Sequence, residues 1–404
     1  MFHAFAGNIE GIARLFELGL ASPFDTNDKF GYTALHYAVD KGHIDLCRFL
    51  LKAGARPDIT DLDEHTVTDI AWNKICSKKM SAGEVAALEE LFKKDEWFEE
   101  RQFSILHKIV LDLLPTSRSL EQELSASTST VDLADSEGRT PLSWAAERGS
   151  SLAVKTLLRY GASFLSKSIT GMTPLHYAAK APDSACLNIL LKHGASASAK
   201  NKWNQSPLNI ACYFQDDSLF IAPFLDHGAD INERDCYSST ALSCAAFVNN
   251  INTARYLISR GADINSQDRL GINTLNESIE NNSHECISLM LDSGADLSIA
   301  DQAGETALHL IARCADLQTL RIFQGADLED MDPDVRNNAG LTARELFAQR
   351  VDVSTDVAKA FQHLMGILDP ESTCLRFFDA AEKLPIPEKV LAVVEVTVEE
   401  VMAQ

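Results

Sequence analysis

Eleven histidines are the residues of this 404-residue chain best suited to acid–base or metal chemistry. Four of them hold the same place in a recurring short motif, which reads TPLHYAA at 173–179. These are His36, His107, His176 and His309. Other copies of the motif have different polar residues there: Asp69, Ser143, Asn209, Ser243, Asn276 and Glu345. All of these side chains form hydrogen bonds, but they share no single reactive chemistry. Because catalysis needs one constellation at one place, the pattern predicts a structural hydrogen bond in each copy.

Nine cysteines offer thiol or metal chemistry, but they are spread singly along the chain. No two of them form the CxxC pair that zinc sites and redox motifs use. Cys186 and Cys286 stand where an early copy of the motif has Leu46, which predicts small buried apolar side chains. The sequence also lacks a phosphate-binding GxxxxGK[ST] loop, a GxSxG elbow and an HExxH motif. We therefore expect no catalytic residue, no metal site, no cofactor and no enzymatic activity.

Composition restricts the class of partner and the compartment. Hydrophobic residues make up 46% of the chain and charged residues 23%, as in an ordered protein. The apolar runs are far shorter than the roughly 20 residues of a membrane helix, and the N-terminus does not resemble a secretion signal. With unpaired cysteines, this predicts an intracellular, cytoplasmic protein, the nucleus being a second possibility. The net charge of −22 disfavours nucleic acids and anionic lipids, so we expect a protein partner and a monomeric chain.

The motif recurs with a nearly constant period. Its marker leucines are separated by 33 or 34 residues over most of the chain: Leu142, Leu175, Leu208, Leu242, Leu275 and Leu308. Leu35 and Leu106 mark earlier copies, with a weaker one, HTVTDIA, at 65–71. A late copy, GLTARELF, spans 340–347. Such a period is typical of a repeat array in which each unit packs on its neighbours.

Each copy predicts two short helices. A threonine or serine precedes the motif and is expected to cap the first helix: Thr33, Thr140, Thr173, Ser206, Thr240 and Thr306. Pro141, Pro174 and Pro207 follow three of these caps, at the first helical position. A second apolar-periodic helix ends at a Gly-Ala pair at 54–55, 161–162, 194–195, 228–229, 261–262, 294–295 and 325–326. Glycine there predicts a left-handed residue after the helix.

These residues resemble the ankyrin repeat, most closely in GYTALHYAVDKGHIDLCRFLLKAGA at 31–55 and GMTPLHYAA at 171–179. The resemblance implies an all-α ankyrin-repeat solenoid of helix–turn–helix pairs joined by β-hairpin-like loops. The stretch from ILHKIV to GRTPLSWAA is similar to long ankyrin proteins of filamentous fungi. The family's members bind partners at the hairpin tips and at the ends of the inner helices, the helices that carry the motif.

The resemblance covers residues 1–350, which we expect to form an array of about ten repeats. The period is irregular at 72–134, and the chain is expected to begin within its first repeat, either by truncation or with an atypical cap. Residues 351–404 lose the period. We expect a C-terminal capping helix at 355–368, followed by an acidic and apolar tail that either covers the end of the array or extends from it.

Two consecutive repeats depart from the others by carrying apolar residues at the expected contact positions. The inner-helix ends hold Tyr213-Phe214 and Phe247-Val248, where other repeats have charged or polar pairs. The hairpin tips of the same repeats hold Trp203 and Tyr237, where others have Asp63, Glu137 or Thr170. Clustered exposed aromatics are typical of interface hot spots. The six residues are therefore candidate partner-binding residues, although they could instead cover the neighbouring repeat.

The function predicted is a non-enzymatic scaffold that binds a protein partner on the concave face and hairpin tips of the array. A second hypothesis makes the chain the ankyrin portion, or a subunit, of a larger signalling or enzymatic protein whose catalytic domain lies outside these residues.

Overall fold

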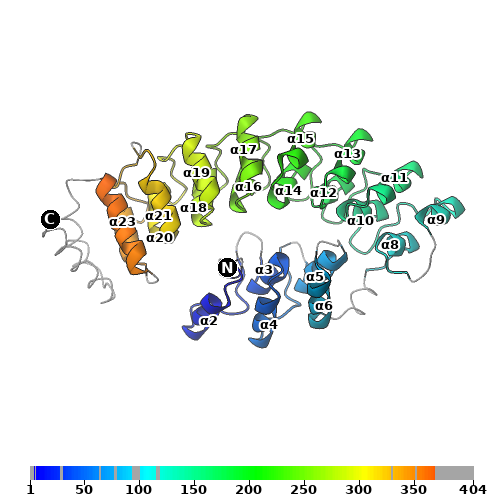
Figure 1. The fold of residues 1–404 in the computed structure, drawn as a ribbon, viewed down its shortest axis with the longest axis horizontal. Coiled ribbons are helices and arrows are strands. Elements are labelled where there is room, and N and C mark those ends of the chain that lie inside the picture. The colour runs from blue at the N-terminus through cyan, green and yellow to red at the C-terminus, as the bar shows by residue number, and fades with distance from the viewer. Residues whose placement is uncertain are drawn as a thin grey trace. The chain divides into compact units, whose positions relative to one another are not determined.

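The computed structural model describes residues 4, 6–27, 31–62, 65–76, 80–92, 101–114, 119–328, 331–350 and 353–368. The regular elements of these residues are all helices, and isolated antiparallel bridges occur in the loops, for example between Thr26 and Thr33. The chain falls into two compact units, Met1–Lys202 and Trp203–Gln404. The predicted all-α fold of helix pairs is confirmed (Figure 1). The predicted tail at 388–404 lies outside the described residues.

The first unit is built from short helices that alternate between two layers. The inner helices, which carry the repeated motif, are α3 (Ala34–Lys41), α5 (Val67–Cys76), α8 (Ile105–Val110), α10 (Pro141–Glu147) and α12 (Pro174–Ala178). The outer helices are α2 (Ile9–Glu17), α4 (Ile44–Lys52), α6 (Ala82–Leu91), α9 (Leu120–Ala126), α11 (Ser151–Arg159) and α13 (Ala185–Lys192). Inner helices pack on inner helices, as α10 does on α12, and outer helices on outer helices, as α11 does on α13.

The second unit repeats this arrangement. Its inner helices are α14 (Pro207–Phe214), α16 (Ala241–Phe247), α18 (Thr274–Glu280), α20 (Ala307–Cys314) and α22 (Ala343–Ala348). Its outer helices are α15 (Ser218–Asp226), α17 (Ile251–Ser259), α19 (His284–Asp292), α21 (Leu317–Gln324) and α23 (Thr355–Leu368). Successive inner helices contact each other from α14 to α22, and successive outer helices from α15 to α23. The inner helices, each with one copy of the motif, therefore lie side by side in the order of the chain.

The caps of the inner helices follow directly from the local sequence. Thr33 accepts a hydrogen bond from the backbone N–H of His36, while Nδ1 of His36 accepts one from the backbone N–H of Thr33 at 3.0 Å. The other predicted caps are the N-cap residues of their helices. The prolines after three of them stand in the first turn, as predicted. Each cap satisfies backbone N–H groups that an isolated helix leaves unpaired.

The glycines after the outer helices adopt the left-handed conformation at six of the seven predicted positions, for example Gly261 with φ of 91°. Gly325 is the exception, and that prediction is wrong. Gly325 is itself the C-cap of α21, with φ of −100°. The next N–H, of Ala326, bonds to the carbonyl of Phe323. After Gly261, by contrast, the N–H of Ala262 reaches back to Leu257. The tighter turn after α21 has no need of a left-handed residue.

The core is formed by the marker leucines and the small residues beside them. Leu35, Leu142, Leu242 and Leu275 have no exposed surface, and the remaining markers are similarly buried. Trp144 also has none, so this aromatic belongs to the core. Because each inner helix buries its leucine against the helices of its own and adjacent repeats, stability is shared between neighbours.

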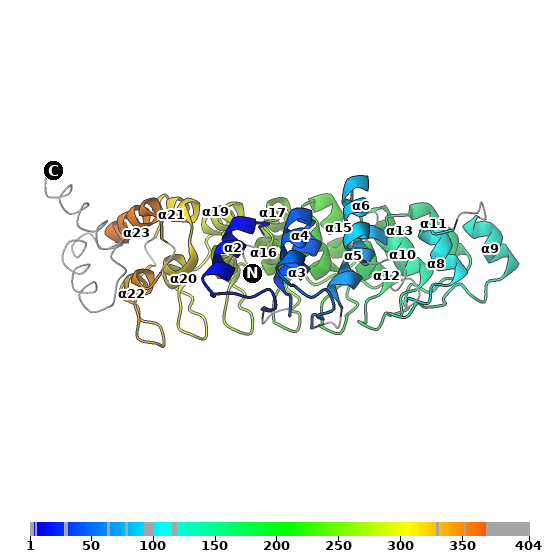
Figure 2. The same ribbon diagram turned by 90° about the horizontal axis from the view of Figure 1, so that it is seen from below.

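The hairpin-like loops of successive repeats are joined by single backbone hydrogen bonds. In each case an N–H near the tip of one loop donates to a carbonyl at the tip of the preceding loop. The bonds run from Ile169 to Glu137, Lys202 to Thr170, Cys236 to Trp203, Arg269 to Tyr237 and Gln302 to Leu270. In the second unit these loops extend together to one side of the helices (Figure 2). The bonds therefore fix the spacing of the tips.

Candidate partner-binding site

Three of the six candidate residues form an aromatic cluster at the ends of α14 and α16. The ring of Tyr213 stacks on that of Phe247, with centroids 5.8 Å apart and planes at 23°. Phe214 meets the edge of Tyr213 at 5.3 Å. Phe214 is 44% exposed, while Tyr213 and Phe247 are half-buried. Val248, the C-cap of α16, is half-buried too, and we call these four residues the helix-end cluster.

The step from Leu208 to Leu242 is 34 residues, one more than the other steps between Leu142 and Leu308, and the residues after α14 are held in place by the following repeat. Gln215 ends α14 in an extended conformation, and its carbonyl accepts a hydrogen bond from the hydroxyl of Thr253 at 2.7 Å. The carboxylate of Asp216 accepts one from the backbone N–H of Asn252 at 2.7 Å. These bonds anchor the end of α14 to the start of α17 while Phe214 keeps its exposed face.

Trp203 and Tyr237 are at the tips of consecutive loops, as predicted, and both are half-buried. The N–H of Tyr237 donates to the Asp235 carboxylate at 2.8 Å. The same carboxylate oxygen accepts from the N–H of Ser239 at 2.9 Å. Asp235, itself buried, therefore shapes the loop that presents Tyr237. The contacts thus place the six residues in two groups, the helix-end cluster and the loop tips.

Leu270 is a further apolar tip that the sequence comparison missed. It is 58% exposed, and its N–H donates to the Asp268 carboxylate at 2.8 Å, as that of Tyr237 does to Asp235. The signal was available, since Leu270 stands directly before Gly271, in the place of Trp203 and Tyr237. Leucine is apolar but not aromatic, so Leu270 stands apart from Trp203 and Tyr237 in residue type. We call Trp203, Tyr237 and Leu270 the apolar tips.

Two of the apolar tips are followed by residues in a strained backbone conformation. Asn204 has φ of 59° and Ser238 has φ of 65°, where the loops on either side have Gly171 and Gly271. Residues other than glycine in this region cost about 1–3 kcal/mol and tend to gather at functional sites. The side chain of Asn204 donates to the carbonyl of Arg234 at 2.8 Å, which offsets part of that cost.

His107 and His309 form the predicted structural hydrogen bonds, but the prediction is wrong for Asn276, whose buried side-chain amide has no hydrogen-bond partner among the described residues. Nδ1 of His107 accepts from the N–H of Ser104 at 3.2 Å, and Nε2 donates to the carbonyl of Arg139 in the next repeat at 2.9 Å. Burial lowers the pKa of His107, so the neutral ring persists at neutral pH. His309 forms the same pair of bonds, to Thr306 and to the carbonyl of Leu341. Rings held in this way link neighbouring repeats.

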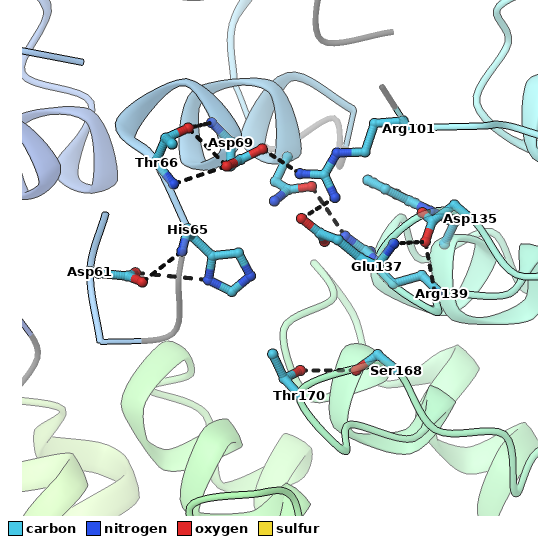
Figure 3. Close-up of polar contacts among 12 residues, drawn as sticks. Asp61, His65, Thr66, Asp69, Arg101, Asp135, Glu137, Arg139, Ser168 and Thr170 are labelled. Carbon is cyan, nitrogen blue, oxygen red and sulfur yellow. Dashed lines mark hydrogen bonds and ion pairs between the residues drawn. The ribbon is translucent and has the colours of Figure 1, made fainter. Parts of the chain in front are cut away.

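A buried ionic network takes over this linking role in the irregular part of the first unit (Figure 3). Asp69, in the histidine position, pairs with Arg101 at 2.7 Å, and Arg101 also pairs with Glu137. Arg101 is only 3% exposed. The Asp135 carboxylate accepts from the N–H groups of Glu137 and Arg139 at 3.0 and 2.8 Å, as Asp235 does at the tip of Tyr237. The network therefore joins successive repeats through charge.

Cys186 and Cys286 are core residues. Burial raises the pKa of Cys186 and of Cys286 to about 12, so neither is a ready nucleophile. Both have no exposed surface, as the sequence predicts. Within the described ranges, no three His, Cys, Asp or Glu side chains lie close enough to bind a metal ion. The same ranges include no helix that is long and apolar enough to cross a membrane.

Comparisons with known proteins find ankyrin repeats in this chain. The family model "Ankyrin repeats (3 copies)" matches residues 107–201 and 182–268, and the model "Ankyrin repeat" matches residues 30–62. No curated protein sequence matches the chain. Among solved structures, the ankyrin repeat domain of Bcl-3, described as a unique member of the IkappaB protein family, is 26% identical. The match covers 57% of this chain and 100% of that domain, with a TM-score of 0.46.

Proposed function

Because the chain is an ankyrin repeat protein, we propose that it is a non-enzymatic scaffold that binds a partner protein through Trp203, Tyr213, Phe214, Tyr237, Phe247 and Val248. Ankyrin repeats are generally protein-interaction modules. The observation that supports this particular surface most is the stack of Tyr213 on Phe247 beside the 44% exposed Phe214. Hot spots of protein interfaces are rich in such aromatic side chains.

The binding mechanism is recognition by a preformed surface. The inner helices are capped and packed in a row, so the helix-end cluster is rigid before a partner arrives. A rigid aromatic surface loses little conformational entropy on binding, which favours affinity. The apolar tips add a second set of contacts from consecutive loops. Backbone hydrogen bonds between these loops fix their spacing.

Free thiols support an intracellular location for this scaffold. Eight cysteines among the described residues are free, as expected for a chain kept in a reducing compartment. We place the protein in the cytoplasm, with the nucleus as the second possibility, and imaging of the tagged full chain tests this.

The test of the proposed function is Trp203→Ala combined with Tyr237→Ala. Proteins captured by the wild-type chain are identified by mass spectrometry, and their binding to the double variant is then measured directly. We expect affinity to fall by about tenfold or more, since truncating a hot-spot residue costs about 2 kcal/mol. Because both residues lie at loop tips, the melting temperature should change little.

Tyr256→Ala is the matched control, since Tyr256 is a half-buried aromatic on the outer helix α17 of the same unit. Its binding should equal that of the wild type. A double variant that melts at a much lower temperature yet binds with unaltered affinity would refute the proposal, because the two aromatics would then be packing residues.

A further inference from the structure

The two units differ strongly in charge. Residues 203–404 hold 32 of the 58 acidic residues but only 13 of the 36 basic ones, so they carry −19 of the net charge of −22. Residues 1–202 carry only −3. The helix-end cluster and the apolar tips all belong to the acidic unit. A partner that docks there meets a negative field, which attracts cations and repels anions.

The acidic charge comes close to the helix-end cluster itself. Glu280 occupies, on α18, the place that Tyr213 and Phe247 occupy on α14 and α16, and α18 packs directly on α16. Asp216 and Asp217 follow α14 and are both exposed. Glu285 is exposed and bonded to Asn249, the residue after Val248. Carboxylates therefore lie in the segment that follows α14 and at the end of α18, the inner helix that packs on α16.

Basic side chains are absent from the inner helices that carry the cluster, and the neighbouring loop tip has the exposed Arg269. The three consecutive inner helices α14, α16 and α18 carry no lysine or arginine, and α18 carries two glutamates, Glu277 and Glu280. The next inner helix, α20, has Arg313, which pairs with Glu280 at 2.7 Å and with Glu305 at 3.0 Å. That arginine is engaged with two carboxylates of the protein, so the three groups together keep a net negative charge.

Resting on the proposed function, we propose that the partner presents a cationic segment, with lysines or arginines on both sides of an apolar side chain that packs on the helix-end cluster. The basic residues pair with the flanking carboxylates, and the apolar residue covers Phe214. A second copy of this chain is a poor occupant, because two surfaces of the same negative charge repel each other. Nucleic acid is excluded by the same argument.

Three synthetic fluorescent peptides test the inference with the full chain. The first has lysines flanking a phenylalanine, the second replaces each lysine by glutamate, and the third replaces the phenylalanine by serine. We expect the lysine peptide to bind, the glutamate peptide not to bind, and the serine peptide to bind about tenfold more weakly. Binding of the lysine peptide should weaken as salt is raised, since exposed ion pairs are screened.

Variants of the chain locate the binding. Phe214→Ser should weaken the lysine peptide about tenfold, and because Phe214 is 44% exposed the variant should still fold, which its melting temperature checks. Leu219→Ser is its matched control, an apolar residue 76% exposed on the outer helix α15, and it should leave binding unchanged. Asp217→Asn should weaken binding about twofold to fivefold, as expected of one exposed ion pair, and asparagine can keep the N-cap of α15.

The results separate this inference from the proposed function. If the glutamate peptide binds more tightly than the lysine peptide and Phe214→Ser abolishes that binding, the surface binds a partner but the charge inference is wrong. If Phe214→Ser and Leu219→Ser weaken the lysine peptide equally, the binding is non-specific and the inference is likewise wrong. A wild-type dimer that Phe214→Ser dissociates would show that a second copy is the occupant. The proposed function fails separately, when captured partners bind the Trp203→Ala and Tyr237→Ala double variant as tightly as the wild type.

Discussion

Replacing Arg101 by methionine should strongly destabilise the first unit. Arg101 is 3% exposed and pairs with two carboxylates from different repeats, those of Asp69 and Glu137. Methionine retains much of the length and apolar surface of arginine, so the change removes mainly the charge. The carboxylates of Asp69 and Glu137 are then left without the cation that they share.

The expected loss follows from the burial of the three groups. Removing one partner of a buried ion pair costs about 3–5 kcal/mol, because the charge left behind is desolvated and unpaired. The side chains of Asp69 and Glu137 are 22% and 16% exposed, so water reaches both in part. We therefore expect the lower limit, about 3 kcal/mol. For a unit of this size that lowers the melting temperature by about 6–12 °C.

Thermal and urea unfolding of the full chain measure the change, and Arg159→Met provides the matched control. Arg159 pairs with Glu121 across repeats at 2.9 Å, but the two side chains are 61% and 59% exposed. An exposed pair of this kind contributes about 1 kcal/mol or less. Adding Glu137→Gln to Arg101→Met should recover part of the loss, since it removes one unpaired carboxylate.

Equal effects of Arg101→Met and Arg159→Met would refute the reasoning, because burial would then have no bearing on the strength of the pair. A further loss on adding Glu137→Gln would also contradict it.

Three further changes have expected outcomes. Gly271→Ala should lower the unfolding free energy by about 1 kcal/mol more than Gly261→Ala. Both glycines have positive φ, but of the two only Gly271 would place an added Cβ close to other backbone, 3.0 Å from the Cα of Asp301. Equal urea midpoints for the two variants would contradict this reasoning. Because burial lowers the pKa of His107, its contribution to stability is present above the ordinary histidine pKa of about 6.5 and is lost as pH falls through the lowered value. His107→Asn should therefore flatten the fall of stability between neutral and mildly acidic pH, and an unchanged slope would disprove it. Asp235→Ala should cost about 3 kcal/mol through two lost hydrogen bonds to loop N–H groups, and Asp235→Asn clearly less. Similar unfolding curves for the two variants would show that the acceptor oxygen at this position has no role.

The local parts of the fold were readable from the sequence. Thr240 caps α16 and Pro207 starts α14 because such signals act within a few residues. The left-handed glycines followed from the same local logic, except at Gly325, where the loop after α21 turns more tightly. The conformation of such residues is set by their neighbours in the chain, so it can be predicted from a short stretch of sequence.

Parts that join distant residues were harder to predict. Arg101 and Asp69 are 32 residues apart, in a stretch where the period fails, so no alignment of repeats brings them together. The sequence predicts that Tyr213 and Phe247 lie close together, but it does not predict the angle at which their rings stack. Leu270 shows a different limit, since its importance comes from its exposure and not from its residue type.

The backbone bonds between successive loop tips allow the opening of each repeat junction to be measured separately, by amide hydrogen exchange. The amide protons of Cys236, Arg269 and Gln302 each donate to the preceding loop, and each exchanges with solvent deuterium only when those two loops separate. Exchange rates measured at these amides would therefore report, junction by junction, how often the stack opens. A partner lying across Trp203 and Tyr237 would slow amide exchange at Cys236 and Arg269. Exchange at Asn338, whose N–H donates to the carbonyl of Ala303 farther along the chain, would be unchanged.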